Sequence, residues 1–415
     1  VTSLREALAL ANSDADESII TFDLDVGDRT ITLAGTELVL SSDVTIDGDI
    51  DGDDVADITI SGGGLSRVFN VNGKTADLVA LTITGGNAGS SYGGGVLIGG
   101  EATVNLTNST LSGNAADIGG GIANLGTATL TNSTLSGNDA YLSGGGIAND
   151  GTVTLTNSTL SGNSAYYGGG GMFNYDGTAT LTNSTLSGNT ADAGGGIFNE
   201  NGTATLTNSI VLGNTAVDDA EVRGTVTATN SITGANGETV ADVFADPDDT
   251  TGGGLLDDNG GPVQTIALKA DASNPALDAG NDMAAPATDA SGAGRFDIAN
   301  VGNDDMDFGD LGALELQLQS ETRSLVVTTS DDVVDAFDGL TSLREAIAYA
   351  DSLAGTDTIT FDLAVGDRTI TLGGTQLVLS SDLTIDGDID GDDVADITIS
   401  GDTDGNGLGE SRVFN

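Results

Sequence analysis

A two-residue alternation of polar and apolar side chains recurs along the middle of the chain. In residues 127–131, threonines at the odd positions alternate with Ala128 and Leu130, the pattern of a strand with one buried face. Asn132 interrupts the alternation, which then resumes with Leu135 facing inward and Thr134 facing outward. A glycine-rich turn and a third apolar stretch follow. The pattern predicts three short strands, joined by corners of Asn and Gly.

The same nine-residue phrase marks successive segments of this kind. Leu-Thr-Asn-Ser-Thr-Leu-Ser-Gly-Asn occurs four times and an altered copy follows. Its central asparagines, 24 to 26 residues apart, are Asn108, Asn132, Asn157, Asn183 and Asn208. A period this short indicates one coil of a stacked solenoid, and Asn tolerates the left-handed backbone of a corner while its amide bonds to the Asn of the next coil. We therefore predict an all-β, right-handed parallel β-helix, its hand following from the crossover rule.

A second, longer repeat encloses the first. Residues 1–61 recur at 340–400 with 48 of 61 positions identical, which suggests a portion of a longer tandem array. Ser3 and Glu6 have the spacing of a capping box, so a short N-terminal helix is expected to cover the first coil. The predicted parts are a cap helix, first coils and an aspartate loop in 1–70, regular coils in 71–235, a closing region in 236–320, a linker or first strand of the next unit in 321–339, and the start of a second copy in 340–415.

Composition limits the partners of this fold. The 415 residues include 63 acidic and 11 basic side chains, a formal charge of −52, and no Lys or Arg lies between Lys74 and Arg223. Such a field repels nucleic acid and anionic membrane surfaces and favours cations as small partners. The chain has no cysteine, and no apolar run is long enough for a membrane span. We expect neither nucleic-acid binding nor membrane insertion.

Aspartate-rich loops carry the most specific chemistry. Residues 49–57 place Asp at positions 1, 3, 5 and 9 with Gly at position 4, a spacing that resembles the calcium hairpin loop of integrin-type repeats. Ca²⁺ takes about six to eight oxygen ligands, which alternating carboxylates and one backbone carbonyl can supply. The alternative is an acidic solvent loop without an ion, in which the carboxylates repel one another. The predicted calcium ligands are Asp49, Asp51, Asp53, Asp57 and the Val55 carbonyl, then Asp388, Asp390, Asp392, Asp396 and Val394, and in a third loop Asp402, Asp404, Asn406 and Glu410.

Several motifs resemble a known family. Ser3–Ala7, with Thr2 before it, is similar to the CSLREAI motif of bacterial surface β-helix proteins, and 325–340 resembles the strand that precedes that motif. Residues 257–268, 274–280 and 310–315 resemble the C-terminal part of the same family, often called choice-of-anchor domains. Gly194–Asn199 is similar to polymorphic outer-membrane protein repeats. The resemblance implies a secreted or surface-displayed bacterial β-helix and no particular enzymatic activity.

Catalytic chemistry is sparse in the repeats. The chain has no His, the central coils have no Lys or Arg to act as a lyase base, and their aspartates are spread about one to a coil. We therefore predict a non-enzymatic, extracellular structural module of a tandem-repeat surface adhesin or filament, stabilised by calcium. Its expected partners are neighbouring copies of the unit, and cell-surface glycans or other cells. Two alternatives stay open: a polysaccharide-binding or polysaccharide-degrading β-helix, and an ice-binding solenoid that uses stacked threonine ladders.

Overall fold

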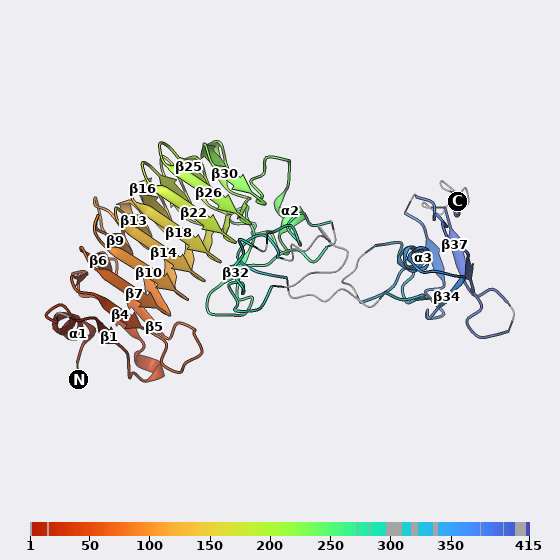
Figure 1. Cartoon of the computed structure of the whole chain (residues 1–415), viewed down its shortest axis with the longest axis horizontal. Helices are drawn as coiled ribbons and strands as arrows, with labels where there is room; N and C mark the ends of the chain where they lie inside the picture. Colours follow the sequence, from red (N-terminus) through yellow and green to blue (C-terminus); the bar gives the residue numbers. More distant parts are fainter. Residues whose placement is uncertain are drawn as a thin grey trace. The chain divides into compact units, whose positions relative to one another are not determined.

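The computed structural model forms two compact units, residues 1–317 and 318–415, and each is described by itself. The described residues are 2–14, 16–271, 273–281, 283–295, 309–316, 323–334, 339–373, 375–392, 394–402 and 412–415. Unit 1 is a parallel β-solenoid, as the repeats predicted, and its strands follow one another along the stack in Figure 1. No helix among the described residues has the length and apolar character needed to cross a membrane.

Two sheets carry the threonine and leucine alternation. The first, of nine strands, is β1 (Ser18–Ile20), β4 (Val44–Asp47), β7 (Thr75–Val79), β10 (Thr103–Thr107), β14 (Thr127–Thr131), β18 (Thr152–Thr156), β22 (Thr178–Thr182), β26 (Thr203–Thr207) and β30 (Thr227–Thr229). The second, of eight, is β2 (Thr30–Thr32), β5 (Ile58–Ser61), β8 (Leu81–Thr84), β11 (Thr110–Ser112), β15 (Thr134–Ser136), β19 (Thr159–Ser161), β23 (Thr185–Ser187) and β27 (Ile210–Val211).

Two further sheets complete the coils. The third, of five strands, is β12 (Ala115–Ile118), β16 (Asp139–Ser143), β20 (Ser164–Ala165), β24 (Thr190–Ala193) and β28 (Thr215–Asp218). The fourth, of eight, is β3 (Leu38–Leu40), β6 (Phe69–Val71), β9 (Val96–Ile98), β13 (Ile122–Asn124), β17 (Ile147–Asn149), β21 (Met172–Asn174), β25 (Ile197–Asn199) and β29 (Val222–Gly224). The prediction of three strands in a coil is therefore wrong for the coils that carry the third sheet, because residues after each Gly-Asn corner also form parallel strands, with a register shift between β12 and β16.

The interior is built from small aliphatic side chains. One continuous cluster of buried residues runs from Leu4 to Val211, and Ala128, Leu130 and Leu135 are fully buried in it, as the alternation predicted. Because coils repeat in register, Leu130 lies between Leu106 and Leu155 of the neighbouring strands. Each coil buries its few apolar groups only by stacking on the next.

Asparagine ladders turn the corners. Asn132 has a φ of +47°, the left-handed conformation that its corner position predicted. Its Nδ2 donates to Oδ1 of Asn108 at 3.3 Å, and Nδ2 of Asn157 donates to Oδ1 of Asn132 at 3.1 Å. Two more ladders were not predicted. They are Asn114–Asn138–Asn163–Asn189–Asn214 and Asn124–Asn149–Asn174–Asn199.

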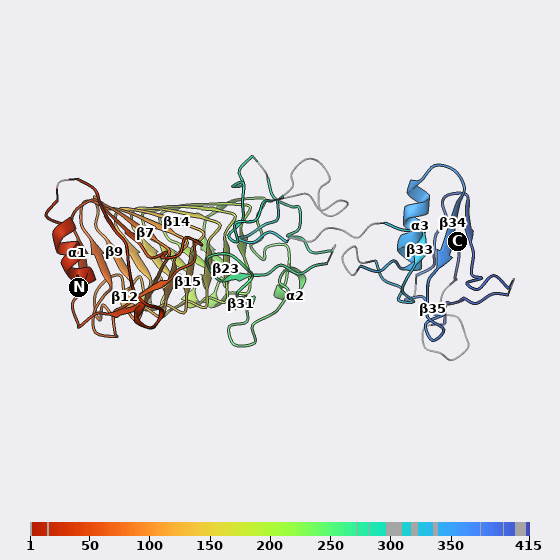
Figure 2. The same ribbon diagram turned by 90° about the horizontal axis from the view of Figure 1, so that it is seen from below.

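A helix covers the first coil. The helix α1 (Leu4–Ala11) begins with the predicted capping box, in which Ser3 N donates to the Glu6 carboxylate at 2.8 Å and Ser3 Oγ accepts from Glu6 N at 3.3 Å. Leu4, Leu8 and Ala11 join the solenoid core, and Figure 2 shows α1 across the N-terminal end of the stack. A 3-10 helix, η1 (Val26–Asp28), follows β1. The right-handedness of the solenoid stays a prediction.

The segment after the last coil packs along the outer face of the second sheet. It contains α2 (Val240–Val243) and the antiparallel pair β31 (Leu256–Asp257) and β32 (Thr265–Ile266). Thr134 Oγ1 donates to the Gln264 carbonyl at 2.6 Å, and Thr185 Oγ1 accepts from Ala313 N at 3.1 Å. Thr134 faces outward as predicted, yet it is buried because this segment covers it. The role of 236–320 as a closing cap stays a prediction.

Unit 2 repeats the beginning of unit 1. The helix α3 (Leu343–Ser352) has the same capping box, formed by Ser342 and Glu345. Its strands pair in parallel: β33 (Val326–Val327) with β34 (Asp357–Phe361), β34 with β36 (Leu383–Ile385), and β35 (Thr369–Thr371) with β37 (Thr398–Ser400). A separate core of buried residues lies beneath α3.

Candidate cation-binding loops and exposed surfaces

The first aspartate loop connects β4 to β5. Its tight course comes from side chains that accept backbone N–H groups of the same loop: Asp49 Oδ1 accepts from Gly52 N at 2.7 Å, and Asp49 Oδ2 accepts from Asp54 N at 3.0 Å. Gly52 has a φ of +85° and Asp54 a φ of +66°, so the loop needs residues that tolerate the left-handed region. Asp53 Oδ1 accepts from Val55 N at 2.9 Å. The loop is thus ordered by its own hydrogen bonds.

Each loop gathers three carboxylates that could hold a metal ion. Asp49, Asp51 and Asp57 each offer an oxygen within 4.8 Å of the others. In the second loop the corresponding group is Asp388, Asp390 and Asp392. The sequence named all six of these residues. The structure does not bring Asp53 into the first group or Asp396 into the second.

An arginine contacts each loop, and the sequence analysis missed it. Arg29, which follows η1, forms an ion pair with Oδ1 of Asp57, while Oδ2 of Asp57 accepts from Ile50 N at 2.9 Å. Arg368 forms the same ion pair with Asp396. Both arginines lie 28 residues before their partners and in the preceding coil. A search for paired positions in the two copies would have found them, since Arg29 and Arg368 occupy equivalent places in the 339-residue repeat.

The loop carboxylates shift one another's pKa. Repulsion from Asp53 is the largest cause that raises the pKa of Asp51, followed by partial burial and the charges of Asp57 and Asp49. For Asp49, burial is the largest single cause and raises the pKa. The N–H groups of the loop, those of Gly52 and Asp54 foremost, together outweigh it, so the pKa of Asp49 is lowered. A bound cation would relieve the repulsion at Asp51.

The other predicted ligands lie outside the two groups of three carboxylates. Val55 and Val394 lie on exposed parts of their loops, 40% and 62% exposed. In the third loop, Asp402 N donates to Ser400 Oγ at 3.2 Å. Asp404, Asn406 and Glu410 lie outside the described residues.

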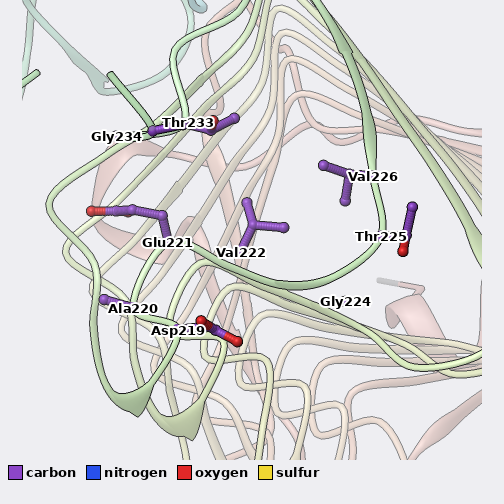
Figure 3. Close-up of a pocket in the computed structure, with 10 residues that line it drawn as sticks. Asp219, Ala220, Glu221, Val222, Gly224, Thr225, Val226, Thr233 and Gly234 are labelled. Atoms are coloured by element: carbon purple, nitrogen blue, oxygen red, sulfur yellow. The ribbon is translucent and has the colours of Figure 1, made fainter. Parts of the chain in front are cut away.

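A depression of about 570 Å³ lies at the C-terminal end of the coils. It is lined by β29, by residues 219–221 before it and by the loops on either side of β30; Val222, Val226, Asp219 and Glu221 are among the lining residues drawn in Figure 3. The Glu221 carboxylate accepts from Asn214 Nδ2 at 2.7 Å and from Gly213 N at 2.9 Å, so it ends the second asparagine ladder. Burial raises the pKa of Glu221 despite these bonds. Its hydrogen bonds identify Glu221 as a structural group.

An exposed group of tyrosines breaks the repeat on the third sheet. Tyr141 and Tyr166 occupy the same coil position, and the neighbouring coils carry Asp117 and Asp192 there. The two rings lie 6.2 Å apart and nearly parallel, and Tyr167 packs edge-on against Tyr166 with ring centroids 4.9 Å apart. All three are more than half exposed. In a chain with 4% aromatic residues, this concentration marks a candidate recognition surface.

Comparison with known proteins identifies no family for this chain. A scan of protein-family models and searches of curated proteins and of solved structures found no match to the chain. The parallel β-solenoid fold is therefore established by the structure. The resemblance to bacterial surface proteins rests on the sequence motifs.

Proposed function

We propose that the chain is a non-enzymatic structural module of an extracellular, tandem-repeat bacterial surface protein. The observation that carries this proposal is the unbroken stacking of equivalent side chains through the coils. Asn138 and Asn163 each bond to the same residue type in the next coil, at 2.9 Å in both cases. Such a stack resists bending because every coil is held to its neighbours along its whole length. Neighbouring copies of the unit are its expected partners.

The mechanical role is tested by stretching single molecules anchored at both ends of the chain. Unit 1 is expected to unfold in discrete, high-force steps, because loss of one coil must break a row of ladder bonds. Gradual extension at forces that stretch an unfolded chain would refute a load-bearing role. A parallel screen of neutral and acidic polysaccharides is expected to show no turnover, and reproducible cleavage would refute the non-enzymatic assignment.

Calcium is the cation that the aspartate loops fit. Three carboxylates in each loop supply hard oxygen ligands, and the raised pKa of Asp51 indicates uncompensated negative charge. Arg29 offsets part of that charge at Asp57. We therefore infer that Ca²⁺ stiffens a loop already folded by its own hydrogen bonds, with a dissociation constant on the order of 10⁻⁴ M as in extracellular modules.

Calcium binding is tested by isothermal titration of the whole chain. Asp51→Asn and Asp390→Asn are each expected to remove one binding equivalent. Asp176→Asn, which removes an exposed acid from a turn between coils, is the matched control and is expected to bind as the parent does. Equal binding by all three variants would show that Ca²⁺ only screens the surface charge.

The tyrosine group favours a second candidate function, binding of a neutral glycan. Aromatic faces pack against the apolar faces of sugar rings, while carboxylates such as Asp139 and Asp192 can accept hydroxyl hydrogen bonds. The charge of −52 disfavours acidic glycans. Glycan arrays should show binding that Tyr166→Ala abolishes and that Tyr349→Ala, in unit 2, retains. Binding unaffected by Tyr166→Ala would exclude this surface.

A further inference from the structure

The outer face of the fourth sheet changes character along the stack. Ala148 occupies a position at which the next two coils carry Phe173 and Phe198, and the coil after these carries Arg223 there. The rings are not needed for stacking, because the coil with alanine pairs in the same register. Together with Tyr175, which follows β21, they are here called the fourth-sheet aromatic group (Phe173, Tyr175 and Phe198).

The rings of this group contact one another. Phe173 lies edge-on to Phe198 with ring centroids 5.3 Å apart, and it stacks against Tyr175 with centroids 6.1 Å apart. Gly168 lets the Phe198 ring lie against the backbone between β20 and β21, because a Cβ at Gly168 would come 2.3 Å from a ring atom. Phe173 and Phe198 are partly exposed, and Tyr175 is 44% exposed. The group therefore presents a preformed aromatic surface to solvent.

Carboxylates border Tyr175 on both sides along the stack. The residue after each fourth-sheet asparagine occupies one coil position, and there Tyr175 lies between Asp150 of the preceding coil and Glu200 of the next. Asp176 follows Tyr175 in the chain, and all three acids are exposed. Residues 75–222 contain no Lys or Arg. The group thus combines aromatic faces with local negative charge, a combination that attracts cations.

One cation of the chain already lies on a ring of this group. The guanidinium carbon of Arg223 is 5.2 Å from the centre of the Phe198 ring, within the range of a cation–π contact, and Arg223 also forms an ion pair with Asp218. A guanidinium suits a ring beside a carboxylate better than an ammonium does, because its plane stacks on the ring while its N–H groups reach the acid. Among the described residues, neither Phe173 nor Tyr175 has such a cation.

We propose that the fourth-sheet aromatic group and its bordering carboxylates dock an arginine-bearing segment of a partner protein. Charge complementarity decides the occupant: the chain carries −52, and Arg223 on Phe198 shows the contact within this chain. One incoming arginine stacks on Tyr175 and pairs with Glu200, and a second takes the place of Arg223. The proposal goes beyond the structural role and the glycan surface of the third sheet, and it involves neither the calcium loops nor the asparagine ladders.

The test is a titration of the whole chain with short fluorescent peptides, followed by anisotropy at physiological salt, which screens attraction by distant charges. The probe is a peptide of alternating Gly and Arg. Two comparison peptides replace Arg by Lys, or by citrulline, which keeps the shape of Arg without its charge. The Arg peptide is expected to saturate and to bind more tightly than the Lys peptide, and the citrulline peptide is expected not to bind.

Variants of the protein locate the site. Tyr175→Ala is expected to weaken the Arg peptide about fivefold, as loss of an exposed cation–π contact does. Leu125→Ala is the matched control and should bind as the parent does, since Leu125 occupies the same coil position two coils earlier and is 45% exposed. Arg223→Ala should tighten binding about threefold, because it uncovers the Phe198 ring. Lys74→Ala, which also removes one positive charge, should leave binding unchanged.

Three results would overturn the proposal. Equal binding of the Arg peptide by Tyr175→Ala and the parent would mean that net charge alone attracts it. Equal binding of the citrulline and Arg peptides would mean that the surface takes an uncharged ligand, and absence of saturable binding would leave the surface without this partner. None of these results alters the outcome of the stretching experiment or of the Tyr166→Ala glycan array. Melting temperatures that match the parent are expected and show that each variant is folded.

Discussion

Replacement of Asn163 by Ala tests whether the buried asparagine ladder holds the coils together. Asn163 is completely buried, and its side chain makes four hydrogen bonds. Nδ2 donates to the Leu135 carbonyl and to Asn189 Oδ1, both at 2.9 Å. Oδ1 accepts from Asn138 N at 3.0 Å and from Asn138 Nδ2 at 2.9 Å. One side chain therefore joins three successive coils.

The loss of stability expected for Asn163→Ala comes from the buried groups that lose a hydrogen-bond partner. Asn138 Nδ2 keeps the Leu111 carbonyl at 3.0 Å, and Asn189 Oδ1 keeps Asn163 N at 3.0 Å. The Asn138 N–H and the Leu135 carbonyl lose a bond in the interior, and each such loss costs about 1–3 kcal/mol. We therefore expect Asn163→Ala to lower the free energy of unfolding by about 4 kcal/mol.

The assay is urea denaturation followed by circular dichroism. The midpoint is expected to fall while the slope stays unchanged. Thr154→Val is the matched control: Thr154 lies on the outer face of β18 between Thr129 and Thr180, valine keeps the β-branched shape, and the change should stay within about 0.5 kcal/mol. If Asn163→Ala shifts the midpoint no more than Thr154→Val does, the ladder contributes little and the reasoning is wrong.

Three further predictions concern charge and close packing. Arg29→Ala should make the melting temperature more dependent on Ca²⁺, because it removes the cation beside Asp57; equal calcium shifts in variant and parent would contradict this. Burial raises the pKa of Asp310 to about 7, so its contribution to stability is full below the ordinary value of 3.8 and is lost as pH rises toward 7. Melting scans from pH 4 to 7 should show that loss, and Asp310→Asn should remove it. Gly170→Ala should destabilise unit 1 strongly, because its Cβ would lie 2.5 Å from the Thr190 carbonyl oxygen, whereas Gly27→Ala meets no atom within 4 Å and should melt as the parent does.

The aspartate loops show how far local patterns specify a site. The alternating spacing predicted the clustered carboxylates, because a tight loop of successive residues brings its own side chains together. It did not predict Arg29, which reaches Asp57 from the preceding coil. A contact across 28 residues depends on the coil length and on the stacking register, neither of which the loop itself encodes.

The coil itself is determined by the sequence. Alternation fixes which side chains enter the core, Asn132 fixes a corner through its tolerance of the left-handed region, and the repeat requires each coil to stack on the next. The extra strand of the third sheet escaped prediction because the segments that form it, such as 139–143, have a weak alternation.

Tertiary structure alone decided what covers the outer faces. Thr134 points outward from its coil, yet it is buried, because the segment around Gln264, 130 residues later in the sequence, lies against it. Thr341 is buried because residues 324–334 pass beside it, and Thr328 N donates to its carbonyl at 2.8 Å. Periodicity in the sequence predicts which side chains face the core, because every coil packs its side chains into the same continuous interior. The outer face of a coil does not have to pack against the neighbouring coils in this way, so its contacts depend on which distant segment of the chain lies against it.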